Sequence, residues 1–555
     1  MIGFSSFLFN HGQCLSSTKS VMCSFSLKRI NFPSQFKIGN FTFQHKSVVK
    51  FLGMLLDRKL LWKEHIGYIK RNVENRYQIL RYTCHNNWGA DQNMALLFYR
   101  SYIRSVMDYG SCFFGSASNS VLKPLDSLQR KSIKKCIGFL GSTPNDVVCS
   151  ESGEIPLKKR REFLTGKFII KKISTSSSAI TKIHELFINT LTHKFWIVRA
   201  DPLISSCYYT AQSYSEILKI DNKLPIFTMD YKCFSISPDV HIPSYSNIST
   251  KEEFLSIISS SFADYYQIFT DASKSPLSPV GAAVYDPFRD SYVHSAFHRQ
   301  FSIFFAELAS ISMALNYIQE LPHVNKSTRF IIISDSQSAL MSLKNVKFDS
   351  SFSYIHKDIF ISLLNLGQQD IYVKFLWVKA HMGIPPNELV DKAAKLASKN
   401  EVADKKCVPS DISIDINSLV WEKWRQEFQE EAKGAFYKCI NPVPLAVTWY
   451  NSIGNRREFV RILCRLRSGH AICPQYMYKI GLKDNPECEC GELGTIDHLL
   501  LACSKFSHQR IELISNINRI IKFYQPYSLN FILSLNNLEV YELVFEYIQS
   551  LGLKI

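Results

Sequence analysis

Two short apolar runs, each ending at an aspartate, constrain the fold of this chain more than any other feature. Tyr265-Tyr-Gln-Ile-Phe-Thr270 runs into Asp271, and the unbroken run Phe330-Ile-Ile-Ile-Ser334 runs into Asp335. An unbroken run of this length is typical of a strand that is covered on both faces. In an open α/β sheet, a site forms at the carboxyl ends of neighbouring strands. We therefore predict that each aspartate closes its strand and that the two lie near one another.

Two further acidic residues lie at the edges of predicted helices. Glu307 immediately precedes Leu308, at the edge of a helix face that would pack on the sheet, and Asp391 lies in the first turns of a helix beginning at Asn387. Carboxylates that converge on one point repel unless cations lie between them, and paired hard cations are a common means of cleaving a phosphodiester. The sequence therefore predicts a nuclease site with two Mg²⁺ or Mn²⁺ ions. The alternative is four ordinary surface acids, as most Asp and Glu side chains are.

The segments around these acids predict a mixed sheet with helices packed against it. A hairpin is expected through 281–285 and 291–297, and a short helix from Ser336. Helical spacing is kept by Phe304, Leu308, Ile311, Leu315 and Ile318. Period-two alternation, with the apolar side chains inward, is kept by Ile371, Val373, Phe375 and Trp377. The region begins with consecutive strands and continues with strands and helices in alternation. This order indicates the α/β class.

The order and spacing of the motifs in residues 265–400 resemble a type 1 RNase H domain. The matching pieces are Thr-Asp-x-Ser at 270–273, Ala-Glu at 306–307, Ser-Asp-Ser at 334–336 and His-x-Gly-x-x-x-Asn-Glu-x-x-Asp at 381–391. The resemblance implies a mixed five-stranded sheet with flanking helices. It also implies that the RNA strand of an RNA–DNA hybrid is cut, with two Mg²⁺ ions bound by Asp271, Glu307, Asp335 and Asp391.

The same resemblance assigns roles to residues that spacing alone does not. It places His381 on a mobile loop, where it assists proton transfer or product departure; taken alone, this residue would be read as a structural histidine. It implies nucleic-acid contacts by Ser273, Asn387 and Glu388. The chain departs from the pattern at Pro386, where retrotransposon relatives usually have glycine. Proline restricts φ and removes an N–H, so loop mobility is the property affected.

The positive charge of the chain is concentrated in its first third. The net charge is +17, and residues 1–175 hold 27 Lys and Arg against 10 Asp and Glu, whereas the remaining residues hold 38 of each. A basic segment beside a balanced one predicts that a polyanion is held by the former and worked on by the latter. The alternative, a generally basic surface, explains the sign of the charge but not its placement.

The N-terminal segment resembles the end of a reverse transcriptase of non-LTR retrotransposons. Lys50-Phe-Leu-Gly53 resembles the primer-gripping hairpin, and Leu61-Trp-Lys-Glu-His65 the start of the thumb. Asp108-Tyr-Gly110 and Gly153-Glu-Ile-Pro-Leu157 resemble landmarks of the thumb and connection. No Tyr-x-Asp-Asp motif occurs in the sequence, and Phe262-Ala-Asp-Tyr265 carries a single carboxylate. We expect a nucleic-acid-gripping remnant without polymerase activity.

A cysteine-bearing motif near the C-terminus has the ligand types of a zinc site. Cys488, Cys490, His498 and Cys503 give C-x-C-x₇-H-x₄-C, which suits a closed tetrahedral Zn²⁺ site, although spacing alone leaves zinc open. This motif and the preceding Leu463-Cys-Arg-Leu-Arg-Ser-Gly-His470 resemble the tail of I- and Jockey-like elements. The resemblance favours structural zinc and implies nucleic-acid contacts by Arg465, Arg467 and His470. The alternative is a helix with exposed basic residues.

The number of cysteines and the hydropathy of the chain indicate in which cellular compartment the protein is found. The 15 cysteines are odd in number and scattered, which favours a reducing interior over a disulfide scaffold. No run approaches the roughly 18 apolar residues that span a bilayer. Residues 1–10 are apolar but lack a basic start and a cleavage site, so they are expected to form a strand or a domain edge. We expect a nuclear or cytoplasmic protein that is not secreted and has no membrane partner.

Five segments are predicted from these patterns. They are a reverse transcriptase palm-end and thumb remnant (1–175), a connection or linker (176–260), an RNase H domain (261–402), a helical and zinc-knuckle region (415–515) and a tail (516–555). Within them, 235–250 is expected to be a linker and 417–435 a helix. The predicted function is cleavage of RNA–DNA hybrids by part of a retrotransposon-derived protein, with hybrid, RNA and DNA as partners. The alternative is a non-catalytic nucleic-acid-binding remnant of a retrotransposon.

Overall fold

The computed structural model describes residues 20–555 apart from 27, 29–31, 39–40, 86–87, 176–177, 197–199, 219–224, 244–249, 322–328, 349–351, 403–405, 455 and 523–526. The apolar stretch 1–10 lies outside these residues. The chain forms two compact units. The first contains Met1–Thr165 and Leu419–Ile555, and the second contains Gly166–Ser418. Helices α8 (Leu157–Ser174) and α16 (Pro409–Glu430) contain the points at which the chain passes from one unit to the other.

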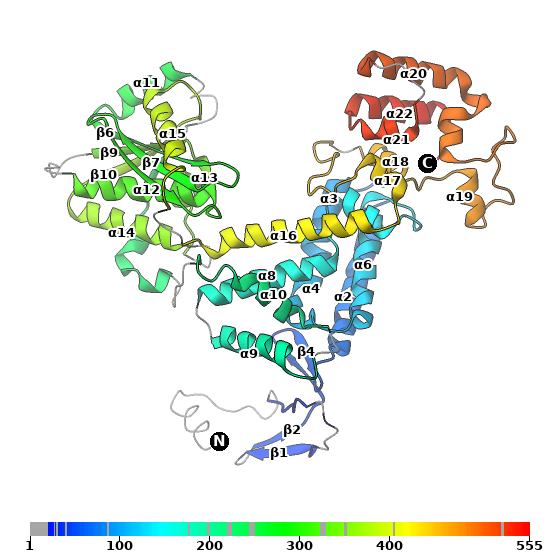
Figure 1. The fold of residues 1–555 in the computed structure, drawn as a ribbon, viewed down its shortest axis with the longest axis horizontal. Coiled ribbons are helices and arrows are strands. Elements are labelled where there is room, and N and C mark those ends of the chain that lie inside the picture. Colours follow the sequence, from blue (N-terminus) through cyan, green and yellow to red (C-terminus); the bar gives the residue numbers. More distant parts are fainter. Residues whose placement is uncertain are drawn as a thin grey trace. The chain divides into compact units, whose positions relative to one another are not determined.

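The first unit is mainly helical (Figure 1). Its N-terminal part contains β1 (Gln35–Ile38), β2 (Phe41–Gln44), β3 (Val48–Phe51), β4 (Met54–Asp57), α2 (Lys63–Thr83), α3 (Gln92–Phe98), η1 (Tyr99–Arg104), α4 (Ser105–Asp108), α5 (Ser111–Phe114), α6 (Asn119–Ile137) and α7 (Asn145–Glu151). Its C-terminal part contains α17 (Ala435–Ile440), α18 (Arg457–Arg467), α19 (Pro474–Lys479), η4 (His498–Ala502), η5 (Ser504–Phe506), α20 (Ser507–Ile521), α21 (Leu529–Ser534) and α22 (Leu538–Ser550).

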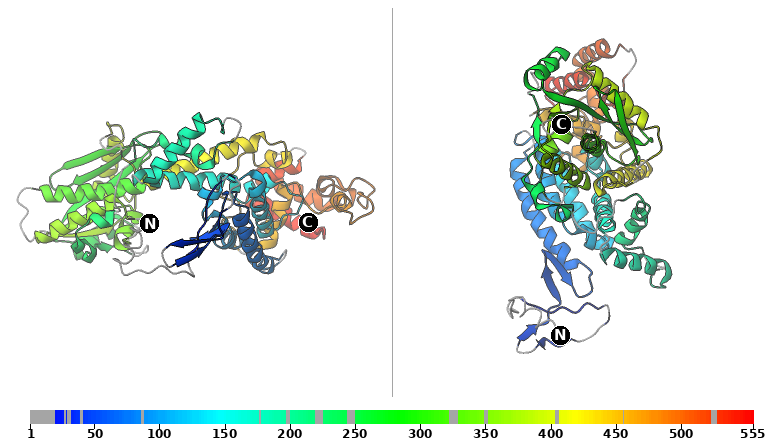
Figure 2. Two further views of the ribbon diagram at one scale, coloured as in Figure 1. Left: turned by 90° about the horizontal axis from the view of Figure 1, so that it is seen from below. Right: turned by 90° about the vertical axis from the view of Figure 1, so that its left-hand side faces the viewer.

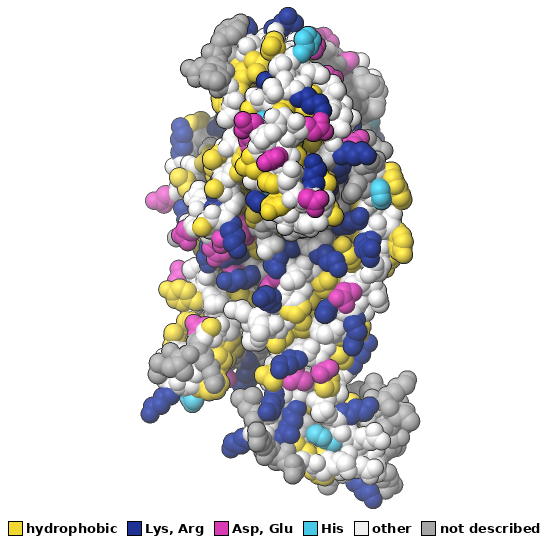
Figure 3. All heavy atoms as spheres, turned by 90° about the vertical axis from the view of Figure 1, so that its right-hand side faces the viewer, with side chains coloured by type: hydrophobic (Ala, Val, Ile, Leu, Met, Phe, Trp, Pro, Cys, Tyr) yellow, Lys and Arg dark blue, Asp and Glu magenta, His cyan; other side chains and the backbone are white. Residues whose placement is uncertain are grey.

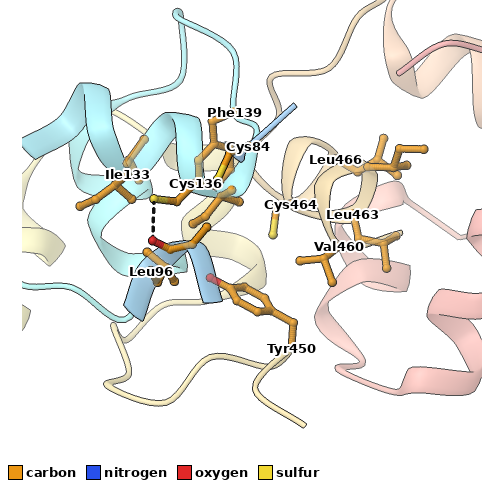
Figure 4. Packing of buried hydrophobic residues seen from close by; sticks show 14 of the residues in the cluster. Cys84, Leu96, Ile133, Cys136, Phe139, Tyr450, Val460, Leu463, Cys464 and Leu466 are labelled. Carbon is orange, nitrogen blue, oxygen red and sulfur yellow. Dashed lines mark hydrogen bonds between the residues drawn. The ribbon is translucent and has the colours of Figure 1, made fainter. Parts of the chain in front are cut away.

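One hydrophobic core joins the two parts of the first unit. Apolar residues of α2, α3 and α6 and those of α18, α20, α21 and α22 belong to the same cluster of buried side chains. Figure 4 shows Cys136 and Phe139 on one side of this cluster and Tyr450, Val460 and Leu463 on the other. The Cys136 thiol donates to the carbonyl of Ala95 at 3.4 Å, the dashed line in that view. Segments more than 300 residues apart in sequence therefore fold as one body.

Helix α6 of this unit has an apolar face and a basic one. Its apolar positions Leu122, Leu125, Leu128 and Ile133 are buried, whereas Lys131 is exposed. The expected hairpin at Lys50–Gly53 also forms, because β3 and β4 pair antiparallel with a two-residue turn between them. Leu52 and Gly53 have φ values of 45° and 83° in that turn. A two-residue hairpin turn of type I′ requires a positive φ at both central residues.

The second unit is built on a six-stranded mixed sheet with the order β5-β10-β9-β6-β7-β8. In Figure 2 the strands of this sheet are green arrows with green and yellow-green helices beside them. Its strands are β5 (Asp239–His241), β6 (Tyr265–Lys274), β7 (Val280–Asp286), β8 (Ser291–Phe297), β9 (Arg329–Ser334) and β10 (Tyr372–Trp377). Neighbouring strands from β5 to β6 pair parallel, and those from β6 to β8 pair antiparallel. Its other elements are α9 (Ser178–Thr192), α10 (Leu203–Gln212), η2 (Pro225–Thr228), η3 (Tyr231–Ser235), α11 (Lys251–Ser261), α12 (Ile303–Glu320), α13 (Gln337–Lys344), α14 (Tyr354–Gln368) and α15 (Pro385–Ala397).

Helices α12 and α15 fix the centre of this sheet. Helix α12 contacts β6 and β7, and α15 contacts β6, β7 and β8. Val390 and Ala394 of α15 share a hydrophobic cluster with Phe269 and Ile333 of the strands. A side chain at Gly281 of β7 would place its Cβ 2.0 Å from the carbonyl oxygen of Ala394, so glycine lets α15 approach the sheet closely.

The predicted mixed sheet with flanking helices is confirmed, and it has one strand more than the five expected. The additional strand β5 lies in 235–250, which was predicted to be a linker, and it pairs with β10 through Val240 and Phe375. Val240 is buried, and Asp239 forms an ion pair with Lys374 at 3.0 Å. The hairpin of β7 and β8 is confirmed, whereas α16 begins at Pro409, earlier than the helix expected from 417. Among the described residues, no helix combines the length and apolar character needed to cross a bilayer.

Candidate active site and metal centre

Strand register brings the two predicted aspartates together. Strands β6 and β9 pair parallel with Thr270 opposite Ser334, so Asp271 and Asp335 are the next residues on adjacent strands. Asp271 does not close β6 as predicted, because β6 continues to Lys274 in pairing with β7. Asp271 lies instead at the point where β9 ends and β6 goes on with a single neighbour. Its carboxylate is thereby aimed at the open edge that β9 leaves.

Helix α12 adds a third carboxylate. Its N-terminus is capped by Ser302, whose hydroxyl accepts a hydrogen bond from the N–H of Phe305. Glu307 follows in the second turn and is 5% exposed. Carboxylate oxygens of Asp271, Glu307 and Asp335 lie within 4.8 Å of one another. The three acids that the sequence placed on separate elements thus form one cluster.

The loop before α15 and the start of that helix form a second group. Nitrogen and oxygen atoms of His381, Glu388 and Asp391 lie within 4.8 Å of one another. His381 is exposed and has a φ of 57°, a left-handed conformation that is strained for a residue with a Cβ. Pro386 lies in the first turn of α15, where an N–H would have no intrahelical partner, so the departure from the family pattern fits the helix start.

Both groups open into one cavity of about 320 Å³. Its lining comprises Asp271, Ala272, Ile303, Phe304, Glu307, Asp335, Ser336, Ser338, Ala380, His381, Asn387, Glu388 and Asp391. All five predicted catalytic residues line it. Of the three nucleic-acid contacts predicted within 265–400, Asn387 and Glu388 line the cavity, whereas Ser273 is not among the lining residues. Ser336 and Ser338 were not predicted as site residues, although they lie one and three positions after Asp335 in the sequence.

Burial and the charges of neighbouring acids make three acids of this cavity, Asp271, Glu307 and Asp335, hard to ionise. Burial, and then the charges of Asp335 and Asp391, raise the pKa of Asp271 to about 8. Burial, followed by the charges of Asp271 and Asp335, raises the pKa of Glu307 well above its usual range. Burial also raises the pKa of Asp335, and a hydrogen bond from Asn387 opposes that rise. Such a cluster stores repulsion that bound cations would relieve.

The polar atoms of the cavity fit hard cations. Among the described residues, Glu307 Oε2 and Asn387 Oδ1 are buried without a hydrogen-bond partner. Buried oxygens without donors are rare in folded proteins, and carboxylate and amide oxygens are ligands that Mg²⁺ and Mn²⁺ accept. Lys395 Nζ meanwhile lies 2.6 Å from Asp391 Oδ2, an ion pair within α15. This ammonium group neutralises one acid of the set.

The cysteine motif of the C-terminal region forms a second candidate metal centre. Ligand atoms of Cys488, Cys490, His498 and Cys503 all lie within 4.8 Å of one another. The Sγ atoms of Cys488 and Cys503 are 3.8 Å apart, and Cys490 Sγ is 3.1 Å from Nε2 of His498. Two thiolates on one tetrahedral Zn²⁺ are separated by about 3.8 Å when each Zn–S bond is about 2.3 Å. Gly491, with a φ of 90°, makes the turn that brings the first two cysteines to the others.

The arginines predicted to contact nucleic acid near this motif are buried instead. Arg465 and Arg467 of α18 are 4% and 2% exposed. Arg465 donates to the carbonyl oxygens of Gly138 and Ile555. Arg467 forms an ion pair with the buried carboxylate of Glu151 at 2.7 Å. Both guanidinium groups are occupied inside the first unit, so the prediction of nucleic-acid contact is wrong for them.

His470, the third predicted contact in this region, is half-buried. Its Nδ1 lies 3.1 Å from the hydroxyl oxygen of Ser142. Burial and the charges of Lys134 and Lys479 lower its pKa.

A comparison with known proteins finds a family match for the region that contains the sheet. Residues 263–399 match the model of the RNase H family. No curated protein matches the chain. The matched region contains the whole lining of the acidic cavity, and the match supports nuclease activity on RNA–DNA hybrids.

Proposed function

We propose that this chain is a metal-dependent endonuclease of type 1 that cleaves the RNA strand of RNA–DNA hybrids and derives from a non-LTR retrotransposon. The convergence of Asp271, Glu307 and Asp335 within 4.8 Å, inside the matched region, carries the proposal. Acids so close together, with raised pKa values and a buried oxygen lacking a donor, have the character of metal ligands rather than of a solvated surface.

The residues of the cavity divide between binding and proton transfer. Asp271, Glu307, Asp335 and Asp391 would hold two Mg²⁺ or Mn²⁺ ions. When bound, such a pair makes water a stronger nucleophile and stabilises charge on the leaving oxygen. The attacking water would form a P–O bond and lose a proton to solvent, as the ester bond on the opposite side of the phosphorus breaks. His381, exposed at the cavity and held by its loop, would give a proton to the leaving oxygen.

Selection of RNA would depend on polar groups beside the acids. The 2′-hydroxyl separates RNA from DNA at a given site. Ser336, Ser338 and Glu388 line the same cavity and offer hydroxyl and carboxylate groups that can hydrogen-bond a 2′-hydroxyl. Asn387 would hold the carboxylate of Asp335, to which it donates.

The parts of the chain outside the nuclease support the retrotransposon origin. The hairpin of β3 and β4 has Lys50–Gly53 at its turn, and the hydroxyl of Tyr109 donates to the carbonyl of Leu52 at 2.5 Å. The segment that resembles the primer-gripping hairpin and the segment Asp108-Tyr-Gly110, which resembles a thumb landmark, are far apart in sequence and are in contact here. The four ligands near the C-terminus would hold one structural Zn²⁺ ion as a knuckle. We expect no polymerase activity, since no Tyr-x-Asp-Asp motif occurs.

The test is cleavage of a hybrid with a labelled RNA strand, in Mg²⁺, by the wild-type chain and by Asp335→Asn. We expect RNA cutting that falls by more than about 100-fold in the variant, because even the loss of an outer partner of a metal ligand costs 10- to 100-fold. Asp264→Asn is the matched control, since Asp264 is an exposed acid just before β6. Duplex DNA should remain intact.

The opposite result would favour the non-catalytic alternative. A folded wild-type chain that binds the hybrid without cutting it, in either Mg²⁺ or Mn²⁺, would show that the chain only holds nucleic acid.

A further inference from the structure

A second cavity, of about 450 Å³, lies in the first unit and shares no residue with the acidic one. It forms where the loop after α2 meets the start of α18 and a side of α22. Its lining contains three aromatic residues, Trp88, Phe459 and Phe545, together with Gly89, Arg456 and Arg457. It also contains one acid, Glu458, whose carboxylate pairs with Arg461. Aromatic faces beside guanidinium groups are the chemistry that receives a base and its phosphate.

Trp88 is the most exposed ring of this cavity. It is 60% exposed, although tryptophan is among the residues most often used to cover a core. One side of its indole ring stacks on His85, with the ring centroids 5.2 Å apart and the planes inclined by 14°. Most of the surface of Trp88 is open to solvent. Trp88 belongs to no hydrophobic cluster of the described residues, so the core does not explain its position.

The backbone that carries Trp88 is held firmly. The N–H of His85 donates to the carbonyl of Trp88 at 3.1 Å, and the N–H of Ala90 donates to that of Thr83 at 3.0 Å. Arg457, which is 4% exposed, donates to the carbonyl oxygens of His85 and Ala90, both at 2.6 Å. Because the backbone at this position is already ordered, little conformational freedom is lost there when a ligand stacks on the ring.

Gly89 completes this anchoring. Its φ is 100°, and a Cβ there would lie 2.2 Å from the carbonyl oxygen of Thr83. Any other residue would push the loop away from α2, so the exposed position of the ring depends on glycine at 89.

The cavity also has a cation suited to a phosphate. Arg456 stacks over the ring of Phe459, with its guanidinium carbon 4.2 Å from the ring centre, and pairs with Glu542 at 2.5 Å. The side chains of this ion pair are 44% and 41% exposed, and exposed pairs contribute little stability. A phosphate can therefore replace Glu542 as the partner of Arg456. The ring of Phe459 would keep the guanidinium group in place during that exchange.

The charge of the whole unit favours an anionic ligand. The first unit contains 40 Lys and Arg against 24 Asp and Glu, a surplus of 16, whereas the second contains 25 against 24. Lys and Arg side chains are spread over much of the face shown in Figure 3. The charges of Arg457 and Arg81 act on Lys135, whose pKa is lowered by burial and then by these neighbours. Cations thus adjoin the loop that carries Trp88.

We propose that this cavity binds a single-stranded stretch of nucleic acid, with one base stacked on Trp88 and a backbone phosphate at Arg456. A single strand fits better than a duplex, because the faces of paired bases are covered by their neighbours in the stack. Stacking reads neither the sugar nor the sequence, so RNA and DNA strands are both ligands. The site is independent of the nuclease proposal, since it uses none of the residues of the acidic cavity.

The test measures the fluorescence anisotropy of labelled dT and rU 12-mers mixed with the full chain. The buffer contains no added Mg²⁺ or Mn²⁺ and no chelator, so that the proposed zinc ion of the same unit is retained. Trp88→Ala should weaken binding roughly 5- to 150-fold, the range of one lost base stack. Trp88→Phe, which keeps a ring, should retain most of the affinity. Tyr82→Ala is the matched control, because Tyr82 is an aromatic residue of the same unit that is 79% exposed and does not line the cavity.

Salt separates the two contacts. The loss in Trp88→Ala should be the same at 50 and 200 mM salt, because stacking releases no counterions. Arg456→Ala should lower the slope of log K against log salt by about 0.7, the value for one phosphate contact on a single strand. The affinity of Trp88→Ala for duplex DNA should equal that of the wild type.

Two results would overturn the proposal. One is equal affinity of the wild type and Trp88→Ala for both 12-mers, with unchanged urea unfolding showing that the variant is folded. The other is an equal loss in Tyr82→Ala, which would indicate a diffuse surface rather than a cavity. Asp335→Asn should bind as the wild type does, so a failure of the nuclease proposal leaves this test intact.

Discussion

Replacing Asp271 with asparagine should stabilise the metal-free protein, against the general rule that changes at buried sites destabilise. The pKa of Asp271 is raised from 3.8 to about 8, so the folded chain holds this proton more tightly than the unfolded chain does. The stability that the protonated acid contributes is complete below pH 4 and is lost as the pH rises through 8. Asparagine has the size of the neutral acid and keeps that form at every pH.

The size of the effect follows from the interval between the two pKa values. Each unit of pH above 3.8 and below about 8 removes about 1.4 kcal/mol from the free energy of unfolding of the wild type. The variant should therefore exceed the wild type by about 2 kcal/mol at pH 5 and by about 4 kcal/mol at pH 7. Saturating Mg²⁺ should raise the stability of the wild type and reduce this gap, because cations relieve the repulsion that the substitution removes.

Amide hydrogen exchange followed by mass spectrometry is the appropriate assay, since it reports each unit of the chain separately. Peptides that cover β6 and β9 should exchange more slowly in Asp271→Asn than in the wild type, in EDTA, and the ratio should grow from pH 5 to pH 7. Exchange rates are corrected for the intrinsic effect of pH. Asp264→Asn, the exposed acid just before β6, should show no such change.

A wild type that is more stable than Asp271→Asn in EDTA at both pH values would refute this reasoning. It would mean that the carboxylate of Asp271 is stabilised by its surroundings without metal. A constant difference at the two pH values would also contradict it, because the free energy would then come from packing rather than from a proton.

Three other substitutions test separate parts of the structure. Lys395→Ala should tighten Mn²⁺ binding about 2-fold in calorimetric titration, since it removes an exposed cation that pairs with Asp391 and is worth less than about 1 kcal/mol; unchanged or weaker binding would contradict that. Arg467→Ala should lower the stability of the first unit by about 3–5 kcal/mol in urea unfolding, because it leaves the carboxylate of Glu151 buried without its ion pair; a loss below 1 kcal/mol would show that water reaches the acid. Cys490→Ser should reduce the bound zinc measured by elemental analysis from one ion per chain to none, and retention of the ion would assign it elsewhere.

The candidate active site was predictable because its chemistry lies at the ends of strong patterns. The run before Asp335 is apolar without a break, and the helix that carries Glu307 keeps its spacing through Leu308 and Ile311. Such patterns fix which way an element faces, and the ends of parallel strands then bring the acids together. The order of the acids and their family motifs added the assignment of His381.

Other features of the sheet depend on contacts that no local pattern carries. Strand β5 has three residues, of which only Val240 is buried, and it lies in a stretch whose prolines and serines favour a linker. It is a strand because the edge of β10 offers unpaired backbone groups and Lys374 offers a charge to Asp239. The position of Asp271 was misjudged for a similar reason, since the apolar run ends there while the pairing with β7 goes on.

The arginines of α18 show how tertiary partners reverse a reading of charge. In Leu463-Cys-Arg-Leu-Arg467 the basic residues were expected to face solvent, because arginine is seldom buried unless it is paired. The pairing exists, but its members are distant in sequence: Glu151 lies 316 positions from Arg467, and Gly138 lies 327 positions from Arg465. An arginine that is matched by a buried carboxylate adds nothing to the attraction of a polyanion. In the proposed binding of nucleic acid, the surplus of 16 in the first unit would therefore act through cations nearer the surface, among which Arg456 can exchange its partner.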